Sequence, residues 1–72
     1  MDKKQLEDIF TYHPPFGNQA TRYEQIRAKA KELALLINDA CPESREKSLA
    51  ITHCQSVVWC ANAAIAIHEK PE

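Results

Sequence analysis

An aromatic loop followed by a cationic segment carries the residues best suited to ligand chemistry. Residues 11–20, TYHPPFGNQA, hold two prolines, the only glycine and no charged side chain, as in an ordered or functional loop. Residues 22–31 follow with a local charge of +3, from Arg22, Arg27, Lys29 and Lys31 against Glu24. A Tyr12 ring can stack on a base and an Arg27 guanidinium can hold phosphate oxygens bidentately, which together suggest a nucleotide pocket. A loop that only caps a hairpin beside a solvated basic face also fits, and the residues alone favour it.

Other chemistries find weaker support in the sequence. His53, Cys54, Cys60 and His68 fall on one predicted helix, but Cys54 and Cys60 are turned by about 240° and no second ligand pair closes a tetrahedral set. His53 and Cys54 point about 100° apart, which does not suit a base and its nucleophile. The acidic residues are scattered, and there is no glycine-rich phosphate loop. We therefore expect no metal, no cofactor and no enzymatic activity.

Size and composition predict one small domain that associates with itself. The chain has 72 residues, 44% hydrophobic and 26% charged, with a net charge of −1. A chain of this mass hides only about 60% of its surface when folded, so self-association is expected to support it. The net charge argues against DNA binding. Three cysteines without a C-x-x-C pair or an upstream signal peptide suggest reduced thiols. Polar residues interrupt every apolar stretch, so we expect no membrane insertion.

Turn and cap signals divide this single all-α domain into four segments. We predict a short helix at 1–10, a loop at 11–20, and an antiparallel hairpin of helices at 21–41 and 43–69. Asp2 and Gln5 match a capping box for the first helix. Thr21 and Glu24 match another for the second. Pro42 stops the second helix and can occupy the first turn of the third.

Both long helices have an apolar stripe and additional apolar residues beside it, so we expect the hairpin to oligomerise. The first stripe consists of Tyr23, Ile26, Ala30, Leu33, Ile37 and Ala40. The second consists of Leu49, Thr52, Ser56, Trp59, Ala63 and Ala66, with Trp59 expected to fill the space beside small residues. Leu35, Leu36, Val57 and Ile65 lie off the stripes. Asn62, in an alanine-rich stretch, is more typical of a residue that fixes register between helices than of a ligand-binding group.

Four segments in order, FTYHPP, RYEQIRAKAKELA, CPESREKSLAIT and VVWCANAAIAI, extend over nearly the whole chain. This succession resembles the small helical-hairpin proteins of tailed phages that act as anti-CBASS sponges, which sequester cyclic oligonucleotide signals made by bacterial immune cyclases. The resemblance implies a compact homohexamer that binds its ligand without hydrolysing it in the cytoplasm of the infected bacterial host.

The resemblance also implies a site for cyclic dinucleotides of the cGAMP kind. Tyr12 would stack on a base, His13 and Pro14 would shape the loop, and Arg27 would replace a family lysine that contacts phosphate. Many members carry a basic residue in a second, trinucleotide pocket where this chain has Ile67, which argues against trinucleotide binding. The alternative function is a phage or prophage adaptor that binds a host protein, with no nucleotide ligand and a purely structural loop.

Overall fold

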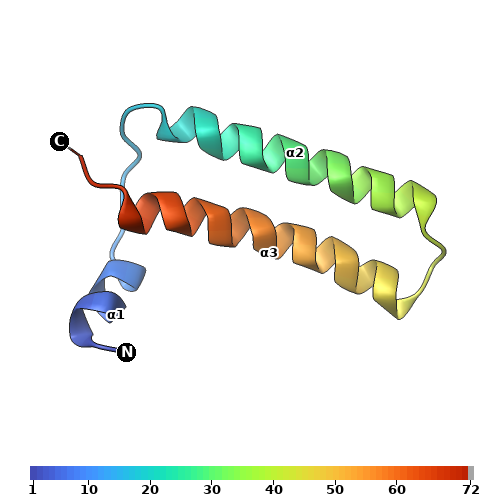
Figure 1. The fold of residues 1–72 in the computed structure, drawn as a ribbon, viewed down its shortest axis with the longest axis horizontal. Coiled ribbons are helices and arrows are strands. Elements are labelled where there is room, and N and C mark those ends of the chain that lie inside the picture. Colours follow the sequence, from blue (N-terminus) through green and yellow to red (C-terminus); the bar gives the residue numbers. More distant parts are fainter. Residues whose placement is uncertain (72) are drawn as a thin grey trace.

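The computed structural model describes residues 1–71, and these residues form an all-helical hairpin with a short additional helix (Figure 1). The elements are α1 (Lys3–Phe10), α2 (Gln19–Ala40) and α3 (Arg45–His68). α2 and α3 run antiparallel, and α1 lies near the carboxyl end of α3. The predicted fold class is therefore confirmed.

The first helix begins as the sequence predicts. The Asp2 carboxylate accepts a hydrogen bond from the Gln5 backbone N–H at 2.8 Å. The Gln5 side-chain oxygen accepts one from the Asp2 N–H at 2.9 Å. Both halves of the predicted capping box are thus present, and two otherwise unpaired N–H groups are satisfied.

The second helix begins at Gln19, two residues before the N-terminus expected from Thr21. Gly17 adopts a φ of +56°, which glycine reaches without the steric cost of a Cβ. This turn lets the Gln19 N–H donate to the Phe16 carbonyl at 3.1 Å, so the helix starts there. Asn18 occupies the N-cap position, and its side chain accepts from Arg22 Nε at 3.0 Å instead of from a backbone N–H. The predicted Thr21 cap is therefore wrong.

The third helix begins at Arg45, and the prediction that Pro42 forms its first turn is wrong. Ser44 is the N-cap, with its hydroxyl accepting from the Lys47 N–H at 3.1 Å. A serine oxygen can satisfy a free N–H of the first turn, which proline at N1 cannot do. The Lys47 side chain is itself buried and pairs with Glu43, whose carboxylate is exposed.

The seam between α2 and α3 uses small residues, and it lies on a different face of α3 from the predicted one. Cys54 is 7% exposed, and among the described residues it is the one apolar residue that is fully classed as buried. On α2 the predicted Tyr23, Ile26, Ala30 and Ile37 are partly buried, as expected. On α3, however, Trp59 is 62% exposed, and Cys54 takes the central place that the pattern gave to Ser56 and Trp59. α3 is apolar on two sides, so its periodicity alone does not show which side meets α2, and an indole needs more space than a close seam leaves.

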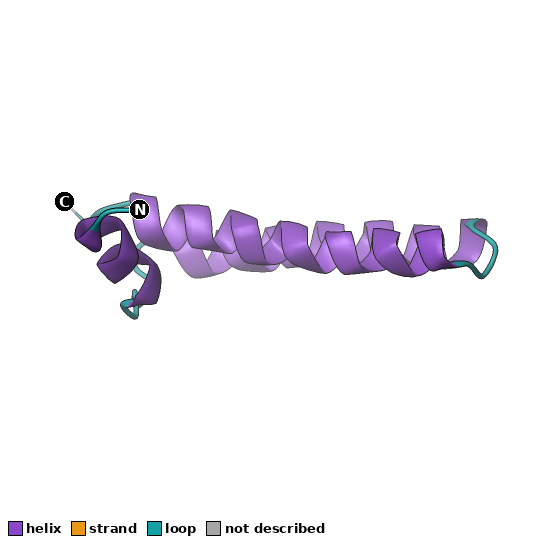
Figure 2. Cartoon of the chain, turned by 90° about the horizontal axis from the view of Figure 1, so that it is seen from below, coloured by secondary structure: helices purple, strands orange, loops and turns teal. Residues whose placement is uncertain are grey.

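The hairpin is a single flat layer that leaves much apolar surface uncovered (Figure 2). It measures 46 × 29 × 12 Å. Its accessible surface of 5853 Å² exceeds by about 1,300 Å² the roughly 4,500 Å² expected for a compact monomer of this mass. Leu35, Leu36 and Val57 are more than half exposed, in line with their predicted position off the seam, whereas Ile65 is partly buried.

Polar interruptions do not by themselves exclude a membrane-spanning helix, so the expectation of no membrane insertion stays a prediction. α3 is long and apolar enough to cross a membrane by length and composition, with a mean hydropathy of 1.3 over its best window. The interruptions between Ser48 and His68 include His, Gln and Asn, and no Asp, Glu, Lys or Arg occurs there. Length and composition are weak evidence by themselves, because a helix buried between protein subunits satisfies the same criteria.

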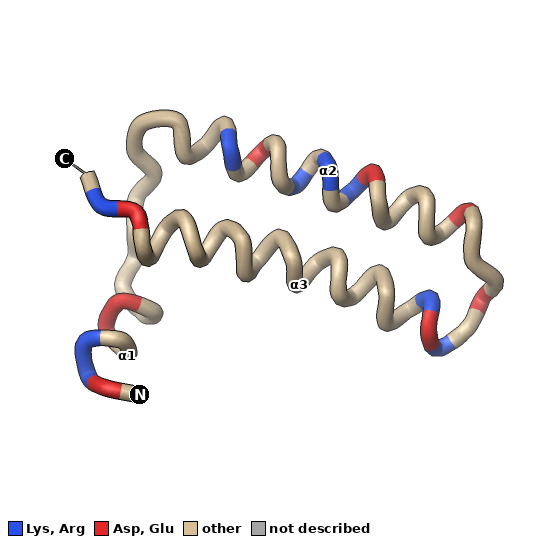
Figure 3. Tube along the Cα trace, viewed as in Figure 1, with Lys and Arg blue, Asp and Glu red and all other residues tan. Residues whose placement is uncertain are grey.

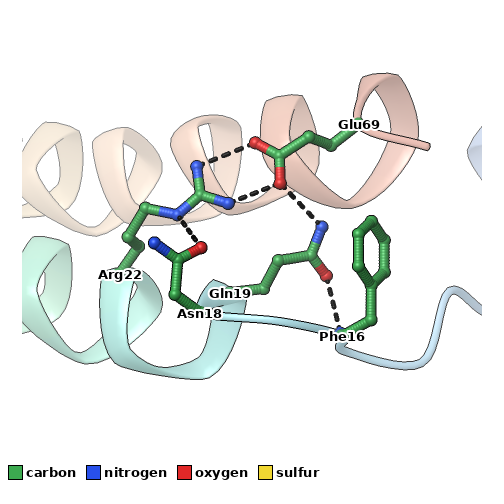
Figure 4. A network of polar contacts seen from close by, with 5 residues as sticks. All are labelled: Phe16, Asn18, Gln19, Arg22 and Glu69. Carbon is green, nitrogen blue, oxygen red and sulfur yellow. Dashed lines mark hydrogen bonds and ion pairs between the residues drawn. The ribbon is translucent and has the colours of Figure 1, made fainter. Parts of the chain in front are cut away.

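A polar network, which we term the clasp, joins the start of α2 to the residue after α3 (Figure 4). It consists of Gln19, Arg22 and Glu69. Gln19 is 2% exposed; its side chain accepts from the Phe16 N–H at 3.1 Å and donates to Glu69 Oε1 at 3.1 Å. Arg22 donates to both Glu69 oxygens, through Nη1 at 2.8 Å and through Nη2. The clasp therefore fixes the end of the loop to both long helices.

The uncovered apolar surface predicts self-association. We expect light scattering at micromolar concentration to give a mass several times 8.2 kDa. Replacing Leu36, which is 62% exposed, by lysine should shift the protein toward smaller species, because it places a charge on an apolar surface. A parent protein that remains monomeric at this concentration would contradict the prediction.

We predict that acid loosens the loop, because the clasp depends on hydrogen bonds accepted by the Glu69 carboxylate. The hydrogen bonds from Arg22 and then from Gln19 lower the pKa of Glu69 from its ordinary 4.5, and the bond to Glu69 raises the pKa of Arg22. Because the Glu69 pKa is lower in the folded chain than in the unfolded chain, its ion pair stabilises the fold fully at a pH above the unfolded-state pKa. This stabilisation is lost as the pH falls through the folded-state pKa. Acidification below about 4.5 should therefore lower the protection factor of the Phe16 N–H in the parent, that is, its exchange relative to the intrinsic rate at the same pH.

A substitution isolates this effect from general acid destabilisation. Glu69→Gln should lower the protection factor of the Phe16 N–H already at neutral pH and make it less dependent on pH. Glu32→Gln is the matched control, since Glu32 belongs to an exposed ion pair with Lys29 at 3.4 Å. Equal exchange rates at Phe16 in both variants would show that the clasp does not hold the loop.

Candidate functional site

The loop between α1 and α2 forms one wall of a cavity of about 400 Å³, which we term the loop cavity. His13 Nε2 donates to the Asp8 carbonyl at 2.7 Å, since a carbonyl oxygen can only accept. This bond ties the loop back to α1. The other wall is the carboxyl end of the chain after α3. The lining residues are His13, Pro14, Pro15, Phe16, Ala66, Glu69, Lys70 and Pro71.

Tyr12 does not belong to the loop cavity. Its side chain is 80% exposed, and Phe10, two residues earlier, is 83% exposed. Both rings are thus open to solvent in the single chain. An exposed tyrosine ring offers a flat apolar face together with a hydroxyl, which suits stacking on a base or contact with another subunit.

Arg27 lies on the flank of the hairpin, where it lines a groove of about 370 Å³ that we term the cationic groove. α2 contributes Arg27, Ala30, Lys31 and Ala34, and α3 contributes Ile51, Cys54, Gln55 and Val58. Figure 3 shows α2, which carries charged residues of both signs, beside a long stretch of α3 without charge. The groove therefore combines two cations with an uncharged opposite wall.

A second groove of about 410 Å³ on the hairpin has a different character, and we term it the apolar groove. It shares Ala30 and Cys54 with the cationic groove, which places these two small residues at the seam between them. Its remaining lining residues are Gln25, Ile26, Lys29, Leu33 and Val57. Leu33 and Val57 are 50% and 58% exposed, so this groove presents mainly hydrocarbon.

The structure separates the predicted site residues within one chain. His13 and Pro14 line the loop cavity, Arg27 lines the cationic groove, and Tyr12 lies outside both. Arg27 is about 12 Å along the helix from Gln19, where the loop ends. No single cavity found among residues 1–71 is lined by all four residues.

The sequence places Lys31 in the cationic segment without assigning it to the site, and it gives Gln55 no role. Lys31 follows Arg27 by four positions, a spacing that places both on one face of a helix, so this signal was available. Gln55 reaches the groove from α3, and nothing in the sequence pattern distinguishes it from other polar residues there.

Ile67 and Asn62 occupy defined positions on α3. Ile67 lines a crevice with the residues Met1, Gln5, Asp8 and Ile9 of the amino-terminal segment, so an apolar contact occupies the position where a basic residue was expected in relatives. The buried Oδ1 of Asn62 has no hydrogen-bond partner among residues 1–71. Its role in helix register stays a prediction. Cys41, Cys54 and Cys60 are all free, and Cys54 belongs to the core.

The chain matches a known protein family over most of its length. The family model described as the Acb2/Tad1 hairpin domain matches residues 2–66, which include the loop, α2 and most of α3. No curated protein and no solved structure matches the chain. The family is linked to the sequestering of cyclic nucleotides against CBASS immunity. Because the match extends over nearly the whole sequence, this chain belongs to the Acb2/Tad1 hairpin-domain family.

Proposed function

We propose that the protein is a phage sponge that binds cyclic dinucleotide immune signals of the cGAMP kind, without hydrolysing them, in the cytoplasm of an infected bacterium. The observation that supports this function best is the cationic groove. Arg27 and Lys31 line it together, and none of the ion pairs among residues 1–71 includes either side chain. A cyclic dinucleotide carries phosphodiester charges that such cations can neutralise.

Tyr12 supplies the second kind of interaction in this proposal. Its exposed ring can stack on a base, while a guanidinium at Arg27 holds phosphate oxygens. These residues lie apart in one chain, so the proposed pocket forms where copies of the chain meet. We propose a homohexamer as the assembly that brings the loop of one copy to its neighbour.

Ile67 bears on the size of the ligand. A basic residue at this position would be expected for a trinucleotide pocket, but here the isoleucine packs in the crevice beside α1. An isoleucine provides no charge for a third phosphate. The proposal is therefore restricted to dinucleotides.

The exposed apolar groove supports a second candidate, an adaptor that binds a host protein. Leu33 and Val57 would then contact that partner and the loop would be structural. A thermal shift on addition of a cyclic dinucleotide favours the sponge, because a ligand that binds only the folded state raises the melting temperature. No shift at millimolar ligand favours the adaptor.

Two substitutions should separate stacking from charge. Arg27→Ala should weaken dinucleotide binding by about 2–5 kcal/mol, since it leaves a phosphate unpaired, and should flatten the salt dependence. Tyr12→Ala should cost about 1–3 kcal/mol from lost stacking, with little change in salt dependence. Tyr12→Phe is the matched control and should bind nearly as the parent does. Calorimetry at two salt concentrations, with the oligomeric state checked for each variant, measures these effects.

Parent-like binding by both alanine variants, with the assembly intact, would contradict the assigned residues. The adaptor function would then be the better interpretation.

The sponge should release its ligand chemically intact. The protein should deplete free cyclic dinucleotide from solution, and heat denaturation should return the same compound, as measured by chromatography and mass spectrometry. Accumulation of linear dinucleotide over time would instead indicate a phosphodiesterase.

A further inference from the structure

Two like charges lie one helical turn apart in the cationic groove. Arg27 and Lys31 are both exposed and both line the groove. Like charges at positions i and i+4 repel each other and destabilise a helix. None of the ion pairs in the described part of the chain relieves this repulsion, although the protein as a whole has a charge of −1. An unfavourable local arrangement of this kind is expected where a ligand compensates it.

The opposite wall of the groove supplies no compensating charge. α3 contains no Asp or Glu between Ser48 and His68, so the groove has a charge of +2 with no acid facing it (Figure 3). Gln55 on this wall brings a side-chain amide, which can donate hydrogen bonds to phosphate oxygens. Three potential donors from two helices thus line a single groove.

The other flank of the hairpin gives an internal comparison. Lys29 is two residues from Lys31 but lines the apolar groove, and it pairs with Glu32 at 3.4 Å. Lys29 therefore has an acidic partner on its own helix, whereas none of the ion pairs among residues 1–71 includes Arg27 or Lys31. Of the two grooves, the cationic groove is therefore the one lined by cations without an acidic partner.

We infer that Lys31 and Gln55 complete the phosphate site of Arg27, so that the cationic groove takes a ligand with two phosphate groups. Positions i and i+4 place Cβ atoms about 5–6 Å apart, which lets the two cations contact separate phosphates. Gln55 then donates from α3 to a phosphate oxygen between them. The identification of the ligand as a cyclic dinucleotide rests on the proposed function, whereas the roles of Lys31 and Gln55 rest on the groove itself.

Calorimetry with 3′,3′-cGAMP and a pair of matched variants tests this inference. Lys31→Gln should weaken binding about 10-fold or more, as expected for the loss of one hydrogen bond to a charged group, and should reduce the salt dependence. Lys29→Gln removes the same charge from the other groove and should leave the affinity within about twofold of the parent. Lys31→Arg should restore most of the binding. Lys31→Gln removes a repulsion within α2, so the melting temperature and oligomeric mass should be retained.

The parent protein offers a second readout. During titration with 3′,3′-cGAMP, the side-chain amide resonances of Gln55 should shift in NMR spectra of the parent and shift much less in Lys31→Gln.

The outcomes distinguish this inference from the proposed function. If the parent binds 3′,3′-cGAMP and Lys31→Gln binds equally well, the role of Lys31 is wrong and the sponge function stands. Equal weakening by Lys29→Gln and Lys31→Gln would show that only the overall charge matters, which overturns the inference. A parent that binds no cyclic dinucleotide overturns the sponge function, and the inference with it.

Discussion

Close packing of two long helices along small residues is the constraint on which the rest of the structure depends. Ala30 and Cys54 occupy the seam and belong to both grooves beside it. A two-helix layer only 12 Å thick buries one stripe on each helix and no more. The remaining apolar side chains stay exposed, and the seam has a groove on either side. The exposed apolar surface, from which we predict self-association, and the two grooves therefore have the same physical origin.

The loop depends on a second constraint, which acts at the open end of the hairpin. Gln19 is almost fully buried because both ends of its amide are hydrogen bonded, to the Phe16 N–H and to Glu69. A buried amide without these partners would be costly. The loop cavity, which Phe16 and Glu69 both line, therefore depends on a contact across 50 residues of sequence.

Much of the fold could be predicted because local signals specify it. The Asp2 cap, the loop and the two long helices follow from neighbouring residues. Thr21 failed as a cap because Gly17 and the buried Gln19 start the helix earlier, a consequence of tertiary contacts. The predicted packing face of α3 was wrong because α3 has two apolar stripes. Only packing against α2 decides that Cys54, and not Trp59, lies in the seam. Tyr12, His13, Pro14 and Arg27 were proposed as site residues from a resemblance, and their separation in space could not be seen from sequence.

The two grooves differ in a way that makes assembly and ligand binding compatible. Lys29 and Lys31 are two residues apart, which turns them by about 200° around the helix and assigns them to opposite sides of the seam. The apolar groove suits contact with another subunit, because Leu33 and Val57 gain most from being covered. Burying the cationic groove in such a contact would instead desolvate two unpaired cations, which is costly. Assembly through the apolar side would therefore leave the cationic side open to the proposed anionic ligand and to the loop of a neighbouring copy.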